Sequence, residues 1–284
     1  MISSCVNLRH PIDAATVDVL GRLVKTAKAQ SVDVLLVGAF AREVLFYHMH
    51  GIETGIGTLD TDISVLVPDW KAFNHLRHAL AGEGFLAVQD DVPEKLREDA
   101  SGIEVDLIPF GPIAGKDFRL HWPQNGPVWN VMGFQEAFDS ALLLPLTAGG
   151  RGQLTIPLIT IPSLCMLKTV AFYDRVTRRA KDGKDIAFVI QHYLPAGNGG
   201  RLEGELVTRA AQDREAAGAV LLGRDIRGVA SESTRTYLVE RLRQETTSAS
   251  ACPLAKVLAH RICKGNFARA RNLLSATLEG LTHA

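Results

Sequence analysis

Apolar and polar positions along the first part of the chain follow the order expected of an α/β sheet. Ala, Val and Leu recur at helical spacing in the first segment, and the run SVDVLLV predicts a buried strand that ends at Gly38. Asp69 precedes WKAFNHLRHALAG as a predicted N-cap. We expect helices over 13–30, 39–49 and 70–82, and strands over 31–37, 61–67, 85–89 and 103–110.

The pattern changes in the second half of the chain. Prolines and glycines interrupt residues 111–162, which predicts irregular connections with one helix (QEAFDSALLL) and one strand (LTIPLITI). From Pro162 onward the apolar spacing is helical to the end, apart from the linker PAGNGGRLEG. The order of elements predicts an α/β sheet followed by a C-terminal helical domain.

Composition and charge exclude several classes of protein. The 284 residues contain 31 Lys plus Arg and 31 Asp plus Glu, so no overall field attracts nucleic acid or an anionic membrane. The four cysteines lack CxxC spacing and are expected to be reduced thiols. The first residues do not resemble a signal peptide, and no apolar run reaches the roughly 18 residues of a membrane helix. We expect a soluble cytoplasmic protein with no membrane partner.

Three aspartates form the candidate chemical site. Asp60 and Asp62 stand two residues apart at the start of a strand, so their carboxylates should share one face, about 6–7 Å apart between Cα atoms. Asp106, in IEVDLIPF, supplies a third carboxylate from a neighbouring strand. Two such anions repel by roughly 2.5 kcal/mol at an effective dielectric constant near 20, and Mg²⁺ would reverse that cost. In the alternative interpretation, Asp60 and Asp62 are turn residues and Asp106 accepts an N–H near an edge.

Gly38 offers a second feature beside these acids. It follows a buried strand and precedes a helix, where backbone N–H groups can face a phosphate. Arg42, one turn into that helix, is placed to add a charge-assisted contact to a triphosphate. The alternative is an ordinary strand-to-helix turn with Arg42 on a solvated face.

The segments GAFARE, TLDTDISVLVPDW and VDLIPFG, in this order, resemble the nucleotidyltransferase (polymerase-beta-like) superfamily and look closest to its AbiEii/AbiGii-type members. These members include type IV toxin-antitoxin and abortive-infection toxins. The resemblance covers about residues 31–195 and implies a mixed sheet flanked by helices. It divides the chain into a nucleotidyltransferase core (1–125), a connecting belt (126–162) and a helical domain (163–284).

The resemblance also implies roles for individual residues. Asp60, Asp62 and Asp106 would be the catalytic metal ligands, with two Mg²⁺ ions expected. The implied nucleotide contacts are Gly38, Ala39, Arg42 and Thr58, together with Lys168, Arg175 and Asp185 in MLKTVAFYDRVTRRAKDGKD.

Simpler interpretations exist for the helical residues, and the chain departs from the family pattern at two positions. Lys168 fits an amphipathic helix on which the lysine ammonium reaches into water. Arg175 and Asp185 fit a charge pair on a helix surface. Ala39 stands where many relatives use a serine to bind phosphate, which weakens the expectation of triphosphate binding. Thr61 replaces the usual apolar residue between the first two acids.

The leading hypothesis is an Mg²⁺-dependent nucleotidyltransferase that moves NMP from NTP to an acceptor hydroxyl and releases pyrophosphate. The acceptor would be an RNA or tRNA end, a protein or a small molecule, and a toxin-like protein would have an antitoxin as partner. The first alternative is an antibiotic-type adenylyltransferase. The second is a degenerate module that binds a nucleotide or a partner. A basic cluster of Arg175, Arg178, Arg179 and Lys181 favours RNA, unless it is a solvated helix face.

Overall fold

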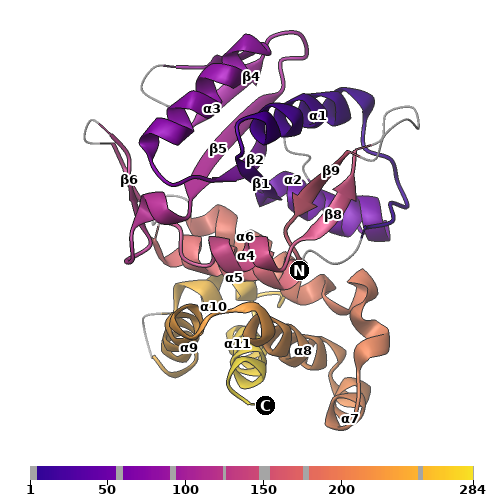
Figure 1. The fold of residues 1–284 in the computed structure, drawn as a ribbon. Coiled ribbons are helices and arrows are strands. Elements are labelled where there is room, and N and C mark those ends of the chain that lie inside the picture. Colours follow the sequence, from indigo (N-terminus) through magenta and orange to yellow (C-terminus); the bar gives the residue numbers. More distant parts are fainter. Residues whose placement is uncertain are drawn as a thin grey trace. The chain divides into compact units, whose positions relative to one another are not determined.

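The chain forms two units, Met1–Thr160 and Ile161–Ala284, in a computed structural model (Figure 1). The residues that the structure describes are 5–55, 60–89, 94–123, 126–146, 154–174, 179–248 and 252–283. Within them, the N-terminal unit contains the strands and the C-terminal unit is helical. No described helix combines the length and apolar character needed to cross a bilayer.

A seven-stranded mixed sheet is the centre of the described N-terminal unit, with the order β3-β4-β5-β2-β1-β9-β8. The strands are β1 (Asp33–Val37), β2 (Asp60–Leu66), β3 (Phe85–Ala87), β4 (Lys95–Glu98), β5 (Glu104–Phe110), β8 (Leu142–Pro145) and β9 (Thr155–Leu158). The pairs β2–β5 and β1–β9 are parallel, and the others are antiparallel. The expected α/β class with a mixed sheet is confirmed.

Helices of the N-terminal unit begin largely where their capping residues predict. They are α1 (Ala14–Ala29), α2 (Gly38–Glu43), its π-helical continuation η1 (Val44–His48), α3 (Trp70–Gly82), η2 (Pro112–Ala114) and α4 (Phe134–Asp139). The predicted N-cap is confirmed, because the Asp69 carboxylate accepts a hydrogen bond from the Ala72 N–H at 2.8 Å. Asp13 caps α1 in the same way through the Thr16 N–H. Helices α1 and α3 pack against each other (Figure 1).

In the segment 126–160, the strand predicted over LTIPLITI is confirmed as β9, but a second strand, β8, was not expected. The helix over QEAFDSALLL ends at Asp139, and its last leucines form β8, which pairs with β9. A separate hairpin joins β6 (Arg119–His121) to β7 (Val128–Asn130). The unexpected strands β6, β7 and β8 have three or four residues, too few to show a periodic pattern, and β8 contains a proline.

Strand β4 was also not expected, and a buried carboxylate holds it in place. Its side chains alternate, with Leu96 and Glu98 buried and Lys95 and Arg97 on the other face. The Glu98 side chain is 3% exposed and lies 2.8 Å from Arg22 of α1. It also accepts hydrogen bonds from the Ser101 hydroxyl and N–H, both at 2.6 Å. Glu98 therefore joins β4 to α1 and closes the turn toward β5.

The C-terminal unit consists of helices, with one close crossing. They are α5 (Ile161–Asp174), α6 (Arg179–His192), η4 (Leu194–Asn198), η5 (Gly199–Arg201), α7 (Glu205–Gln212), α8 (Arg214–Val229), α9 (Glu232–Thr247), α10 (Pro253–Arg261) and α11 (Phe267–Thr282). A Cβ on Gly223 of α8 would lie 2.1 Å from the Thr277 carbonyl oxygen, and one on Gly280 of α11 would lie 2.0 Å from that of Val220. The two helix backbones are in contact because both residues are glycine.

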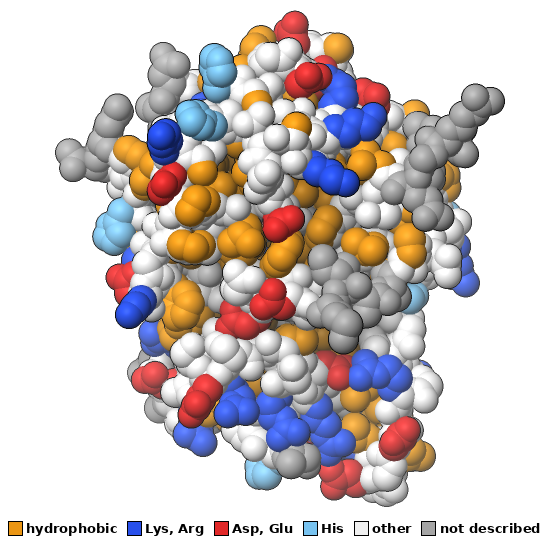
Figure 2. Space-filling model, viewed as in Figure 1, with side chains coloured by type: hydrophobic (Ala, Val, Ile, Leu, Met, Phe, Trp, Pro, Cys, Tyr) orange, Lys and Arg blue, Asp and Glu red, His pale blue; other side chains and the backbone are white. Residues whose placement is uncertain are grey.

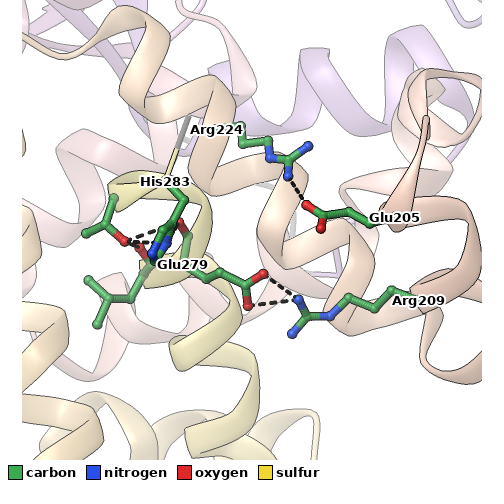
Figure 3. A network of polar contacts seen from close by, with 7 residues as sticks. Glu205, Arg209, Arg224, Glu279 and His283 are labelled. Atoms are coloured by element: carbon green, nitrogen blue, oxygen red, sulfur yellow. Dashed lines mark hydrogen bonds and ion pairs between the residues drawn. The ribbon is translucent and has the colours of Figure 1, made fainter.

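Ion pairs reinforce the packing of α7, α8 and α11 (Figure 3). Arg224 contacts Glu205 at 2.6 Å, and a single Arg209 nitrogen donates to both Glu279 oxygens at 2.7 and 2.8 Å. These groups are partly exposed, so each pair contributes at most about 1 kcal/mol. Lys and Arg side chains gather over the helices of this unit on the face in Figure 2, with acidic side chains among them.

Gly223→Ala should lower the free energy of unfolding by about 1–3 kcal/mol or more, because the new methyl group would overlap backbone atoms of α11. Gly228→Ala in the same helix is the matched control, since nothing lies within 4 Å of the position that its Cβ would take. That variant should be unchanged or up to about 1 kcal/mol more stable. Urea unfolding of both measures the difference, and equal stabilities would contradict the close crossing.

Glu98→Gln should destabilise the protein near neutral pH. Hydrogen bonds from the Ser101 hydroxyl and N–H and from Arg22 lower the pKa of Glu98 to about 2, although burial acts in the opposite direction. A carboxylate with a lowered pKa stabilises the fold above its unfolded pKa and loses this effect as pH falls toward the folded pKa. The stability difference from the unaltered protein should therefore shrink from about pH 4.5 to about pH 2. Glu83→Gln, at an exposed position, should show no such trend in denaturation curves.

Candidate active site

The three predicted aspartates share one face of the sheet. Asp60 and Asp62 alternate in β2 with the buried Thr61. Strand β5 runs parallel to β2, and its register pairs Asp62 with Asp106 and Asp60 with Glu104. Because paired residues on neighbouring strands point to the same side, Asp106 lies on the face of Asp60 and Asp62. The geometry required by the three-carboxylate hypothesis is present, and Glu104 joins it as a fourth acid.

This arrangement concentrates negative charge. Neighbouring strands are about 4.8 Å apart, so two facing carboxylates repel by roughly 3 kcal/mol at an effective dielectric constant near 20. The Asp106 side chain is only 18% exposed, which limits screening by water. A positive group beside these acids is therefore expected on physical grounds.

Lys95 supplies that positive charge, and sequence reasoning missed it. Strand β4 is antiparallel to β5, and its register places Lys95 beside Asp106. The Lys95 Nζ lies 3.0 Å from Asp106 Oδ1, 3.2 Å from Glu104 Oε2 and 3.8 Å from Asp60 Oδ2. Arg97, two residues further along, contacts Glu104 Oε1 at 2.6 Å. The signal in the sequence was the two-residue spacing of these cations, which matches that of the acids.

The proton equilibria follow from these contacts. Burial by itself lowers the pKa of Lys95, but the carboxylates of Asp106, Glu104 and Asp60 outweigh it and the pKa is raised. Hydrogen bonds from Arg97 and then Lys95 lower the pKa of Glu104. Both groups are therefore charged near neutral pH.

Gly38 leaves space for the Asp62 side chain. Strand β1 is antiparallel to β2 and pairs Val37 with Asp62, so the glycine after β1 adjoins this acid. A Cβ on Gly38 would lie 1.8 Å from Asp62 Oδ2, and its φ of +73° lies in the left-handed region. Ala39 is buried next to it, and Arg42 is half-buried one turn later in α2. The expected strand-glycine-helix element therefore borders the acidic face.

The remaining predicted contacts divide into two groups. Thr58 and Arg175 lie outside the described residues, as do Arg178 of the basic cluster and the Arg179 side chain. Lys168 of α5 lies 2.8 Å from Asp185 and 3.1 Å from Asp182 of α6. The side chains of Lys168 and Asp185 are 13% and 3% exposed, so neither is the surface group that the simpler interpretation expected. Asp182 is a second acidic partner of Lys168, and the sequence analysis did not identify it.

The carboxylate face presents oxygen atoms of the kind that divalent cations bind. Carboxylate oxygens are the ligands that Mg²⁺ prefers, Gly38 leaves room for Asp62, and the Lys95 ammonium already serves as a stand-in cation between Asp60 and Asp106. Among the described residues, no group of three or more His, Cys, Asp or Glu side chains is arranged so that it could hold a metal ion.

Comparison with known proteins gives likeness at the level of structure. No family model and no curated protein matches the sequence. The antibiotic-resistance factor ANT(2'')-Ia is 12% identical, with a TM-score of 0.37 over 72% of this chain and 96% of that chain. A nucleotidyltransferase-like antigenic protein from Paracoccidioides brasiliensis is 14% identical, with a TM-score of 0.39 over 71% and 91% of the two chains. An apo CCA-adding enzyme is 14% identical, with a TM-score of 0.26 over 95% and 80%.

Gly38→Ala should displace the Asp62 side chain and destabilise the N-terminal unit. Gly102→Ala is the matched control, because Gly102 has nearly the same φ, +74°, and nothing within 4 Å of its Cβ position. Both variants bear the left-handed backbone cost of about 1–2 kcal/mol. Only Gly38→Ala adds the collision, so urea denaturation should show a larger loss for it. Equal losses would show that Asp62 does not depend on the glycine.

Proposed function

We propose that this protein is an Mg²⁺-dependent nucleotidyltransferase that moves NMP from an NTP to an acceptor hydroxyl. The observation that carries the proposal is the register of β2 and β5, which places Asp60, Asp62 and Asp106 on one face. The stand-in position of the Lys95 ammonium supports it, because a cation is stable among these acids.

The three aspartates would hold Mg²⁺, which supplies charge neutralisation and orientation for the phosphates. The acceptor oxygen forms a bond to the α-phosphorus as the bond to pyrophosphate breaks. Asp106 is proposed to take the proton of the acceptor hydroxyl. Pyrophosphate leaves with the electron pair of the broken bond. The chain thus contributes position and electrostatics, with no covalent intermediate.

The nucleotide contacts are proposed from the residues around Gly38. The backbone N–H groups of Gly38 and Ala39 and the Arg42 guanidinium are assigned to the triphosphate. Ala39 has no hydroxyl, so its contribution is limited to the backbone. Thr58, Lys168, Arg175 and Asp185 remain proposed nucleotide contacts by resemblance.

An RNA or tRNA end is the proposed acceptor class, and a toxin-like role with an antitoxin partner would follow from it. A hydroxylated small molecule, as in an antibiotic-type adenylyltransferase, is the alternative acceptor. Incubation with each labelled NTP, Mg²⁺ and either total RNA or small-molecule extract separates the two. Label in RNA supports the proposed acceptor, whereas label confined to small molecules replaces it with the alternative.

A second candidate function is nucleotide or partner binding without turnover. Lys95 favours it, because its ammonium already offsets part of the negative charge of the acids and so lowers the need for a metal ion. Calorimetry with NTP and Mg²⁺ distinguishes the two functions when combined with the labelling assay. Binding without transfer to any acceptor indicates the second function.

Asp62→Asn should reduce transfer of label from NTP by at least about 10²-fold, because it removes a charged ligand and leaves the shape unchanged. Asp33→Asn is the control, since Asp33 is exposed and pairs with Leu66 at the opposite end of β2. Its transfer rate should match that of the unaltered protein. Unreduced transfer by Asp62→Asn would rule out the proposed mechanism.

A further inference from the structure

Charge is divided unequally between the two units, although the whole chain has a formal net charge of zero. Residues 161–284 contain 19 Lys plus Arg and 12 Asp plus Glu, whereas residues 1–160 contain 12 and 19. The C-terminal unit therefore has an excess of seven positive charges, which the composition of the whole chain does not reveal. An excess of this size on one compact unit attracts polyanions.

Much of the excess lies in residues 246–278, which span α10 and most of α11. This segment contains five Lys and Arg residues and no Asp or Glu. Two of the five, Arg269 and Arg271, are held by partners within the unit. The remaining three are exposed and are Lys256 and Arg261 of α10 and Lys264 in the turn that follows.

Lys256, Arg261 and Lys264 form a basic face whose charged groups are available to a partner. Their side chains make no hydrogen bond or ion pair with any residue that the structure describes. Lys256 and Arg261 are five residues apart, about 7.5 Å along the helix axis. Lys264 extends the face past the end of α10.

Most acids of the C-terminal unit are occupied by contacts inside the unit, so they do not neutralise the basic face. Five cations contact seven of the twelve acidic residues, and these cations are Lys168, Arg201, Arg209, Arg224 and Arg269. An eighth acid, Glu245, is fully buried and accepts hydrogen bonds from the Leu254 and Ala255 N–H groups at the start of α10. The acids thus stabilise the helices, while the basic face remains open to solvent.

Lys264 stands at a strained backbone position. Its φ is +51°, in the left-handed region that favours glycine, and Gly265 follows with a φ of +82°. A lysine here costs stability relative to glycine, and no contact of its side chain with a described residue offsets that cost. A backbone cost without a stabilising contact indicates a role in binding.

The chemistry of the basic face distinguishes among polyanionic partners. A face that binds a membrane or a protein needs apolar side chains beside its charges. The exposed large apolar residues of the described chain are Leu86, Val128 and Val207, and none of them lies in residues 246–278. Nucleic acid phosphates need only the cations. RNA is the nucleic acid that the proposed function uses as acceptor.

We propose that Lys256, Arg261 and Lys264 bind the phosphate backbone of RNA. The choice of RNA rests on the proposed function, and the inference adds the surface that holds the RNA. Contacts of this kind fix the position of the strand and do not read its sequence.

The test is fluorescence anisotropy with a labelled single-stranded RNA of mixed sequence, in EDTA and without NTP. The triple variant Lys256→Gln, Arg261→Gln and Lys264→Gly should bind RNA at least about tenfold more weakly at about 0.1 M salt. The slope of log K against log salt concentration should become shallower by about 2, because three phosphate contacts are lost.

The matched control removes the same amount of charge from the other unit. Lys25→Gln, Lys28→Gln and Lys71→Gln alter exposed positions of α1 and α3. This triple variant should keep the affinity and the salt slope of the unaltered protein. Equal losses in the two triple variants would show an effect of net charge and overturn the inference.

Lys264→Gly alone separates binding from folding. Glycine relieves the left-handed backbone, so urea unfolding should occur at a higher urea concentration, while RNA binding should weaken. A gain in stability together with a loss of affinity cannot come from misfolding. Unchanged RNA affinity in both Lys264→Gly and the first triple variant would overturn the inference.

Two further outcomes concern the partner and the proposed function. Tighter binding to phosphatidylserine vesicles than to RNA would overturn the choice of RNA. Asp62→Asn should bind RNA as tightly as the unaltered protein, because the assay contains neither NTP nor Mg²⁺. Loss of transfer with RNA binding intact would contradict the proposed function alone. Transfer of label by a protein whose basic face binds no RNA would contradict this inference alone.

Discussion

Repulsion among carboxylates on two parallel strands is the constraint on which the rest of the N-terminal unit depends. The β2–β5 register places four acids on one face, and such an arrangement is stable only beside positive charge. Strand β4 brings that charge, and its own attachment to α1 uses a buried acid, Glu98, on the opposite face. Strand β1 ends at a glycine because a side chain there would overlap Asp62. Sheet order, strand anchoring and glycine placement thus serve one electrostatic requirement.

The parts of the fold with strong local signals were predictable from the sequence. Helix α1 has an apolar stripe and an aspartate cap, α3 starts directly after Asp69, and β1 ends in the buried apolar run VLLV. Each signal depends on residues close in the chain, so no knowledge of tertiary contacts was needed. The shared face of Asp60 and Asp62 followed from strand periodicity alone, whereas the addition of Asp106 required the correct pairing of β2 with β5.

The missed features depend on contacts between distant residues. Strand β4 buries a glutamate where a periodic pattern has an apolar residue, and only its partners Arg22 and Ser101 explain this burial. The role of Lys95 requires the β4–β5 register, which no local pattern specifies. Similarly, the burial of Asp185 against Lys168 is invisible until α5 and α6 are paired. A sequence pattern assigns charged residues to surfaces by default, whereas Glu98 and Asp185 are each buried beside a residue of opposite charge.

The central claim is that the aspartate face of β2 and β5 binds a divalent ion with NTP. The most direct measurement is anomalous diffraction from crystals grown with Mn²⁺ and a non-hydrolysable NTP analogue. The account predicts a Mn²⁺ peak within about 2–2.5 Å of carboxylate oxygens of Asp60 and Asp62, bridging to the triphosphate. A nucleotide bound elsewhere, with no anomalous peak at this face, would contradict it.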